Sequence, residues 1–422
     1  MKKIKLEIKA LSPLAISRQK PGGSVSECED YIPGSVIRGA VASAILKQSN
    51  QYLSDLSQDG GDFQALFLGD NPAIFQNAYP SIKTKGKVIP RNQTEEIGVL
   101  PATALSSKTK SGFKTDKNQG VFDSLIDRFC AESYGFAYDP TCPAETGGRV
   151  EPYSSFYSRL NSKYYSVNVK KRFVTRVGIN RRRATSEEEI LYSIQVINES
   201  EANSQNEKPV IFKSELIVTN DGLSDKLEDF IKANSKNFRL GGSVSRGLGK
   251  VEIKIESEDI QDNINEIIKN KIQVFTERLI TRWQEWSNMF HPLQELDKNR
   301  HFFTLNLQSD AILTEKWQRT TVISAKMLKQ LTGIDDKSLE SEATYSSYDY
   351  RSGWNNAWGL MKDVELITNK GAVYLFSTTQ PDKWYTALAR LELEGFGERT
   401  WEGFGQVEVC NDFHLILREN SI

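Results

Sequence analysis

The sequence is poor in histidine and has none in its first half. The 422 residues include only three histidines, His291, His301 and His414. Histidine is the side chain best suited to proton transfer near neutral pH. The first 290 residues therefore lack the usual candidate for general acid–base catalysis.

Cysteine is also scarce. The four cysteines, Cys28, Cys130, Cys142 and Cys410, are too few for a disulfide framework in a chain of this length. Cys130 and Cys142 have the chemistry of half a zinc site. No second cysteine pair and no histidine lies near them in the sequence, whereas a structural zinc site normally uses four ligands. We therefore expect buried thiols, with no metal and no other cofactor.

Long apolar runs are absent, and no segment reaches the length of a membrane span. Met1-Lys2-Lys3 leads directly into an alternating strand and not into the apolar core of a signal peptide. These features predict a cytoplasmic protein. The formal net charge of -1 conceals a basic stripe of seven residues within 170–183. A near-neutral total with such a stripe allows nucleic-acid binding without requiring it.

A glycine-rich pattern occurs twice. Residues 237–253 end in Gly247-Leu248-Gly249-Lys250-Val251-Glu252, and Gly403-Phe404-Gly405-Gln406-Val407-Glu408 repeats this near the C-terminus. Glycines at such spacing let a backbone adopt positive φ and approach another backbone or a phosphate closely. One copy alone is typical of a hairpin turn. Two copies at matching places indicate that the chain contains two versions of one domain.

The order of elements supports this duplication. Residues 4–10 alternate apolar and polar side chains, which predicts a half-buried strand, and a glycine- and serine-rich loop and a helix capped by Ser35 follow. Residues 303–307 restart the same plan. Between 50 and 165 the signal is weak, apart from a predicted helix over 121–132.

One long amphipathic helix is predicted over 259–290. At 1.5 Å per residue it would reach roughly 45 Å, long enough to connect two domains. The sequence therefore predicts an α+β protein with an N-terminal domain at 1–257, a linking helix at 258–292 and a C-terminal domain at 293–422.

Several motifs resemble those of CRISPR-associated RAMP proteins, which are RNA-binding proteins built from ferredoxin-like (RRM-like) domains. The segment Tyr31-Ile32-Pro33-Gly34-Ser35-Val36-Ile37-Arg38-Gly39 resembles the turn and helix start of that family. Residues 241–249 resemble its glycine-rich loop, and 175–181 with 190–192 resemble a strand pair of effector subunits. Gly353-Trp354-Asn355 together with 397–405 is similar to the Csx-ten family of type III-D effector subunits.

This resemblance implies two ferredoxin-like domains with glycine-rich loops and a role in antiviral defence. It implies a subunit of a type III-D effector complex that grips the 5′ handle of the CRISPR RNA (crRNA). The implied partners are the large polymerase-like subunit and the backbone RAMP subunits, with target RNA met indirectly.

Three features are candidates for RNA contact. Exposed amides of the first glycine loop can donate to phosphates, an arginine in the first turn of a helix favours anions, and a stripe of alternating basic and apolar residues can follow a single strand. The alternatives are plain hairpin geometry, a solvated helix residue, and a stripe neutralised by Glu187–Glu189. The candidate residues are Arg38, Lys170, Lys171, Arg172, Arg176, Arg181, Arg182, Arg183, Gly242, Ser243, Arg246, Gly247, Gly249 and Lys250.

Two other segments are assigned to packing or partner contact. The second glycine loop contains Arg399 but also Glu398, Glu402 and Glu408, which would repel phosphate. The aromatic segment Tyr345–Trp358 is able to stack bases, but covering the second domain or contacting a partner is the preferred interpretation.

A ribonuclease is the alternative function. Related processing enzymes place a general base near the helix start, where this chain offers only Tyr31 or a lysine. Related target-cleaving subunits use an aspartate in the loop before the turn, and Asp30 occupies that loop. A protein-only scaffold is a third possibility. We expect the non-catalytic RNA-binding role.

Overall fold

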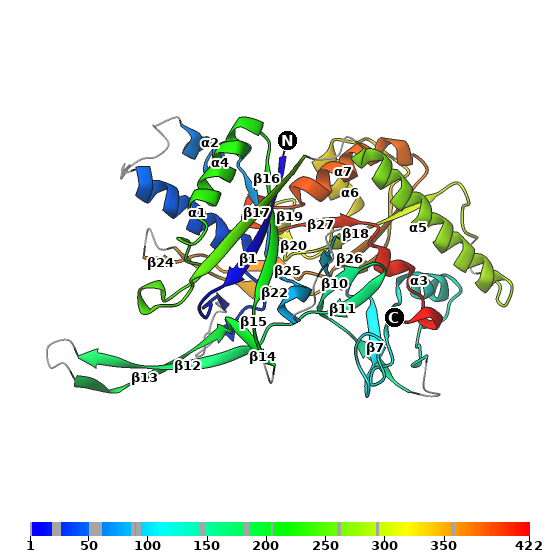
Figure 1. Cartoon of the computed structure of the whole chain (residues 1–422). Helices are drawn as coiled ribbons and strands as arrows, with labels where there is room; N and C mark the ends of the chain where they lie inside the picture. Colours follow the sequence, from blue (N-terminus) through cyan, green and yellow to red (C-terminus); the bar gives the residue numbers. More distant parts are fainter. Residues whose placement is uncertain are drawn as a thin grey trace.

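The computed structural model describes residues 2–18, 27–49, 61–85, 89, 94–143, 148–180, 185–203, 206–259, 263–292, 295–355 and 359–422. The described chain contains two larger antiparallel sheets, one in each half, besides several sheets of two or three strands (Figure 1). In the first sheet the strand order is β17–β1–β16–β4, and β5 also pairs with β16. The strands are β1 (Lys2–Ala10), β4 (Ile74–Phe75), β5 (Tyr79–Pro80), β16 (Ile211–Val218) and β17 (Val251–Asp259).

Helices α1 (Gly34–Ser49) and α4 (Asp221–Ala233) connect these strands and share one core with them. The predicted alternation of the first strand is confirmed, because Ile4, Leu6 and Ile8 are buried and the intervening Lys5 and Glu7 are not. An order of strand, helix, two strands, helix and strand in one antiparallel sheet is the ferredoxin-like arrangement.

The second sheet repeats this order as β27–β18–β26–β21. Helix α6 follows its first strand and helix α7 precedes its last, so both halves have the same topology. The predicted α+β class is confirmed. The elements are β18 (His301–Leu307), α6 (Ala325–Thr332), β21 (Glu340–Tyr345), β26 (Val373–Thr378), α7 (Tyr385–Glu394) and β27 (Val407–Val409).

The long helix is shorter than expected and belongs to the second half. Helix α5 spans Ile264–Ser287, 24 residues or about 36 Å. The predicted start at 259 is wrong because β17 continues through Asp259. Its side chains Ile272, Phe275 and Leu279 share a core with the second sheet. The helix therefore completes the second domain as well as linking it to the first.

A large insertion separates β5 from β16. It forms two three-stranded sheets and a helix, α3 (Leu125–Ser133), so the first residues of the helix predicted over 121–132 are strand. Phe129 of α3 packs into the core of the second domain. The strands are β6 (Glu96–Val99), β10 (Phe156–Leu160) and β11 (Lys163–Ser166), then β7 (Ala104–Ser107), β8 (Val121–Asp123) and β9 (Val150–Pro152).

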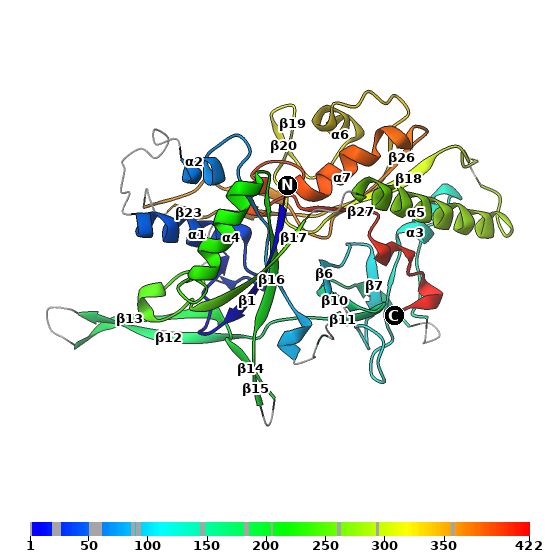
Figure 2. The same ribbon diagram turned by 45° about the horizontal axis from the view of Figure 1, so that its top comes forward.

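The insertion also contains a long two-stranded arm. Strands β12 (Lys171–Asn180) and β13 (Thr185–Ile197) pair along it, and the arm extends away from the body of the molecule (Figures 1 and 2). The remaining short elements are α2 (Asp62–Phe67), β2 (Ser17–Arg18), β3 (Glu27–Cys28), β14 (Ser200–Asn203), β15 (Asn206–Pro209), β19 (Leu313–Glu315), β20 (Gln318–Thr320), β22 (Tyr348–Arg351), β23 (Trp354–Asn355), β24 (Leu360–Met361) and β25 (Glu365–Thr368).

All four cysteines are free and buried, as expected. Within the described residues, no group of three or more metal-ligating side chains is arranged to hold an ion. The helices of the described segments include none with the length and apolar character to cross a membrane.

Candidate nucleic-acid interface

The helix start carrying the first motif is a tight contact between the domains. Helix α1 begins at Gly34, so the expected cap at Ser35 is wrong, and the Gly34 amide donates to Asn77 Oδ1 at 2.8 Å instead. A Cβ added to Gly34 would lie 1.8 Å from the Phe75 carbonyl oxygen and 2.9 Å from that of Glu402. Only glycine allows the second glycine loop to approach this closely.

The first glycine loop is fixed to the segment that follows the first strand. The Gly242 amide donates to the Ala15 carbonyl at 2.8 Å, and the Gly249 amide donates to the Pro13 carbonyl at 2.9 Å. The Gly247 amide bonds within the loop. The expectation that these glycine amides are free for phosphate is therefore wrong.

The second loop makes the same bonds. The Glu398 amide donates to the Ile312 carbonyl and the Gly405 amide to the Asp310 carbonyl, each at 2.9 Å. Both loops contain one short 3₁₀ turn between left-handed residues, over 244–246 in the first and 400–402 in the second. The repeat seen in the sequence is thus a repeat of backbone structure.

The backbone correspondence between the two loops pairs other residues than the positions of the two arginines suggest. Arg399 corresponds to Ser243, because each is the left-handed residue directly before the 3₁₀ turn, with φ of 56° at Arg399 and 57° at Ser243. Glu402 therefore occupies the place of Arg246. Arg399 pairs with Glu402 at 2.5 Å, whereas Arg246 has no acidic partner among the described residues.

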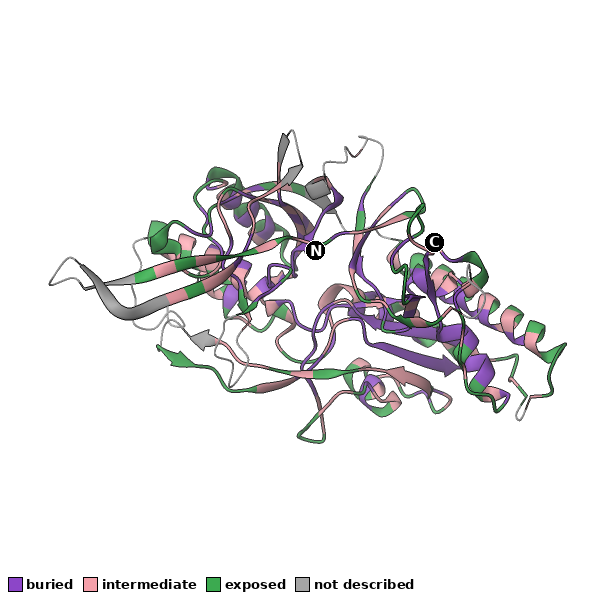
Figure 3. Cartoon of the chain, turned by 90° about the horizontal axis from the view of Figure 1, so that it is seen from below, coloured by how far each residue is buried: buried purple, intermediate pink, exposed green. Residues whose placement is uncertain are grey.

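The arm packs against the first loop through one face. Val174 and Ile194 on that face contact a small core that includes Leu248. The register places Arg176 opposite Tyr192, in agreement with the strand pair expected from the sequence. The described part of the arm is mostly exposed or half-buried (Figure 3).

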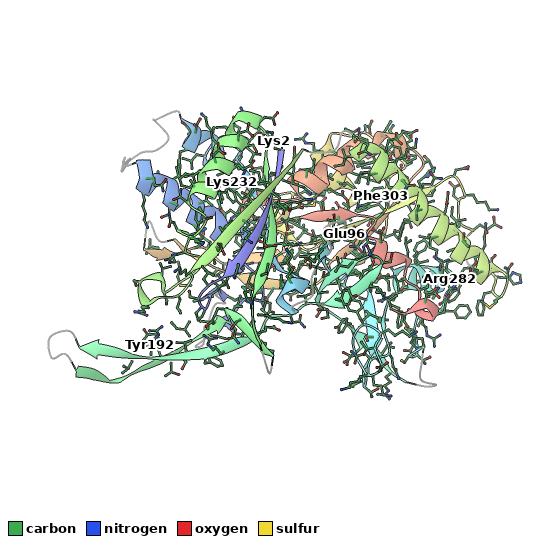
Figure 4. All side chains as sticks on the ribbon, viewed as in Figure 1. Lys2, Glu96, Tyr192, Lys232, Arg282 and Phe303 are labelled. Atoms are coloured by element: carbon green, nitrogen blue, oxygen red, sulfur yellow. The ribbon has the colours of Figure 1, made fainter. Side chains whose placement is uncertain are left out.

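The arm and the loop bring two predicted residues together at Tyr192, which is labelled in Figure 4. Arg246 Nη1 donates to Tyr192 Oη at 2.5 Å, and its guanidinium lies 5.5 Å from the ring centre. Arg176 Nη2 donates to the Arg246 carbonyl at 3.3 Å. Two of the predicted RNA-binding segments thus form one surface.

The base of the stripe is partly neutralised by Asp30 and Glu199. Lys171 Nζ lies 2.5 Å from Asp30 Oδ1, and Arg172 lies 2.8 Å from Glu199. Lys170 is exposed. Arg181, Arg182 and Arg183, together with the side chains of Glu187–Glu189, lie outside the described residues.

Arg38 does not present a free guanidinium at the helix start. It donates to the Phe67 carbonyl and lies 5.4 Å from the Phe67 ring centre. Burial lowers the pKa of Arg38, while Glu402 opposes that shift. The side chain therefore serves the packing of α1 against α2.

A groove of about 900 Å³ runs between the two domains. It is lined by α1, by the first glycine loop and, in the second domain, by residues of 351–353 and 362–367. Three exposed cations from distant parts of the chain line it: Lys47, Arg239 and Lys362. Of the predicted residues that the structure describes, Gly242 alone lines the groove. The sequence alone gave no reason to select these cations, because each is a single basic residue in an ordinary context.

A buried charge cluster holds the domains together beneath the groove. Arg351 of the second domain lies 3.2 Å from Asp310 and 3.4 Å from Glu29, and it donates to the Tyr31 hydroxyl at 3.1 Å. Burial raises the pKa of Tyr31 well above its usual value, although Arg351 opposes the shift. Tyr31 therefore remains a neutral phenol near neutral pH.

Burial alone would raise the pKa of Asp310, but Lys370 and Arg351 outweigh it, so the pKa is lowered. The carboxylate consequently stays charged inside the domain interface. The cluster depends on both domains, because Glu29 and Tyr31 come from the first and the other three residues from the second.

Known structures resemble the chain only distantly. A chain of the type III-B Cmr-beta structure bound to cognate target RNA is 12% identical, with 88% of this chain and 86% of that chain covered and a TM-score of 0.40. A chain of the type III-B Cmr-beta structure bound to cognate target RNA and AMPPnP is also 12% identical. The match covers 91% of this chain and 88% of that chain, with a TM-score of 0.39. No curated protein matches the sequence. The family model described as the RAMP superfamily matches residues 7–252, so this chain belongs to the RAMP superfamily.

Proposed function

We propose that this chain is a non-catalytic RNA-binding subunit of a type III CRISPR effector complex of the III-D kind. It grips the 5′ handle of the crRNA and contacts the large polymerase-like subunit and the backbone RAMP subunits. The observation that carries the proposal is the groove between the domains with its three exposed cations, Lys47, Arg239 and Lys362. Family membership and the RNA-bound assemblies named among the similar structures support it.

The RNA path continues from the groove across the glycine loop to the arm. Gly242 lines the groove, and Arg246 and Arg176 follow where the loop meets the arm. Among the described residues, the amides of 243–245 have no acceptor and can donate to a phosphate. Exposed Lys170 and Lys250 extend the positive surface. We propose these residues, with the stripe at 181–183, as the backbone contacts.

The class of ligand is tested by the RNA that co-purifies with the full chain. We expect a common 5′ tag of about eight nucleotides, within the range of single-strand site sizes. Sequencing the bound RNA provides the measurement. An ordinary protein ratio of absorbance at 260 and 280 nm would contradict the proposal and favour a protein-only scaffold.

The groove is tested by its salt dependence. Arg239→Ala with Lys362→Ala should weaken binding to a single-stranded RNA of the co-purified sequence. It should also lower the slope of log affinity against log salt by about 1.4, since each phosphate contact contributes about 0.7. The double variant Lys383→Ala with Arg390→Ala removes two exposed charges that do not line the groove and should leave the slope unchanged. Equal slopes for both double variants would exclude the groove as the RNA site.

Non-catalytic behaviour is tested at Asp30. The carboxylate is paired with Lys171 and the neighbouring Tyr31 is a buried neutral phenol, so neither is presented as a base. A purified complex with Asp30→Ala should cut target RNA at the same positions as the wild type. Loss of one cut position with RNA binding retained would favour the ribonuclease alternative.

A further inference from the structure

A tryptophan stands at the tip of the β19–β20 hairpin. Lys316 and Trp317 form its two-residue turn, with φ of 50° and 67°. Both residues adopt the left-handed conformation that turns of this kind usually assign to glycine or asparagine. The Trp317 side chain is 99% exposed, more than any other large apolar side chain of the described chain.

The hairpin is held rigidly although its tip is free. Arg319 on β20 lies 2.5 Å from Glu398 of the second glycine loop and 2.7 Å from Glu365 on β25. At the other strand, Ser324 Oγ donates to the Glu315 carboxylate at 3.0 Å. Trp317 therefore stands at the end of a hairpin whose two strands are both fixed by side-chain contacts. Figure 2 shows this hairpin beside α6.

The base of this hairpin lies at the rim of the RNA groove. Ile312, directly before β19, lines the groove, and so does Glu365, which braces β20. Each strand has three residues, so the tip stands about 10 Å beyond the base. Trp317 therefore lies within about 10 Å of residues that line the groove.

We infer that Trp317 stacks on an unpaired nucleobase of the bound RNA, with Lys316 beside the adjoining phosphate. This inference rests on the proposed function and adds one contact to it. The large aromatic face suits base stacking, which tolerates any base. The exposed neighbours Lys316 and Gln318 favour RNA over a protein pocket, because lysine is depleted at the cores of protein interfaces.

The experiment measures affinity and its salt dependence for the full chain with a single-stranded RNA of the co-purified sequence. Trp317→Ala should lower affinity roughly five- to 150-fold, the range for one lost base–aromatic stack. The salt slope should not change, because no charge is removed. Trp317→Phe should restore most of the affinity, and Lys316→Ala should lower the slope by about 0.7.

The matched control is Leu331→Ala on α6, which removes another apolar side chain that is 53% exposed and should leave affinity unchanged. Unchanged RNA affinity for Trp317→Ala would overturn the inference, as would loss of co-purifying protein subunits with RNA affinity intact. If the wild-type chain binds no RNA, the proposed function itself fails, and this inference with it. The unfolding midpoint of Trp317→Ala should equal that of the wild type.

Discussion

Replacement of Gly34 by alanine is expected to destabilise the protein by about 3 kcal/mol, at the upper end of the usual cost of overpacking. The added Cβ would lie 1.8 Å from the Phe75 carbonyl oxygen. That contact is with backbone, so no side chain can rotate away to relieve it. Either α1 or β4 must move, and the closely packed second glycine loop, with the Glu402 carbonyl 2.9 Å away, restricts that movement.

The same helix provides a control for this substitution. A Cβ added at Gly39 has no heavy atom within 4 Å, so Gly39→Ala should stabilise the helix by roughly 0.5–1 kcal/mol through its effect on the unfolded chain. Urea unfolding of the two variants measures the difference. Equal midpoints for Gly34→Ala and Gly39→Ala would show that the domain contact at Gly34 does not constrain the fold.

The second large effect is expected at Arg351. Replacing it with methionine leaves Asp310 and Glu29 buried without their shared cation. Removing one partner of a buried ion pair typically costs about 3–5 kcal/mol. Arg351→Met should therefore lower the free energy of unfolding by that amount. As a control, Arg390→Ala removes an exposed arginine that forms a surface pair with Glu394 and should cost under about 1 kcal/mol. If Arg351→Met lowers the free energy of unfolding by no more than Arg390→Ala does, the charge cluster does not stabilise the contact between the domains.

The cluster also predicts how stability depends on pH. The pKa of Asp310 is lower in the folded protein than in the unfolded chain, because Lys370 and Arg351 outweigh the effect of burial. The unfolded state therefore binds the proton more readily. The ionised Asp310 therefore contributes to the stability of the fold above the pKa of the unfolded chain, about 3.9. This stabilisation is lost as the pH falls through the pKa of Asp310 in the folded protein. Unfolding of Asp310→Asn should show a shallower acid dependence than the wild type below about pH 4.

The sequence predicted the repeated architecture because that information is local. The alternation in 4–10 and 303–307 reappears as central strands of two sheets with the same order. The glycine spacing predicted two loops, and both make equivalent bonds to the segment that follows the first strand of their domain. The strand pair through Arg176 and Tyr192 was also predicted correctly.

Helix boundaries were less accurate. Residues 121–123 and residue 259 belong to sequence segments that were predicted to be helical, yet they pair as strands. Backbone pairing with distant strands overrides local preference at such positions. The chain also gave no sign that α3, within the first half, would complete the core of the second domain.

By itself the sequence determined the duplication, the basic stripe and the family resemblance, since these depend on spacing and residue type along the chain. Only the tertiary structure decided which cations face the groove, because Lys47, Arg239 and Lys362 are separated by more than a hundred residues and meet only after folding. It also decided that Arg38 is packed against Phe67, and that Arg351 and Asp310 join the domains. Burial and ion pairing depend on which distant residues come together in the folded chain, and no local sequence pattern encodes them.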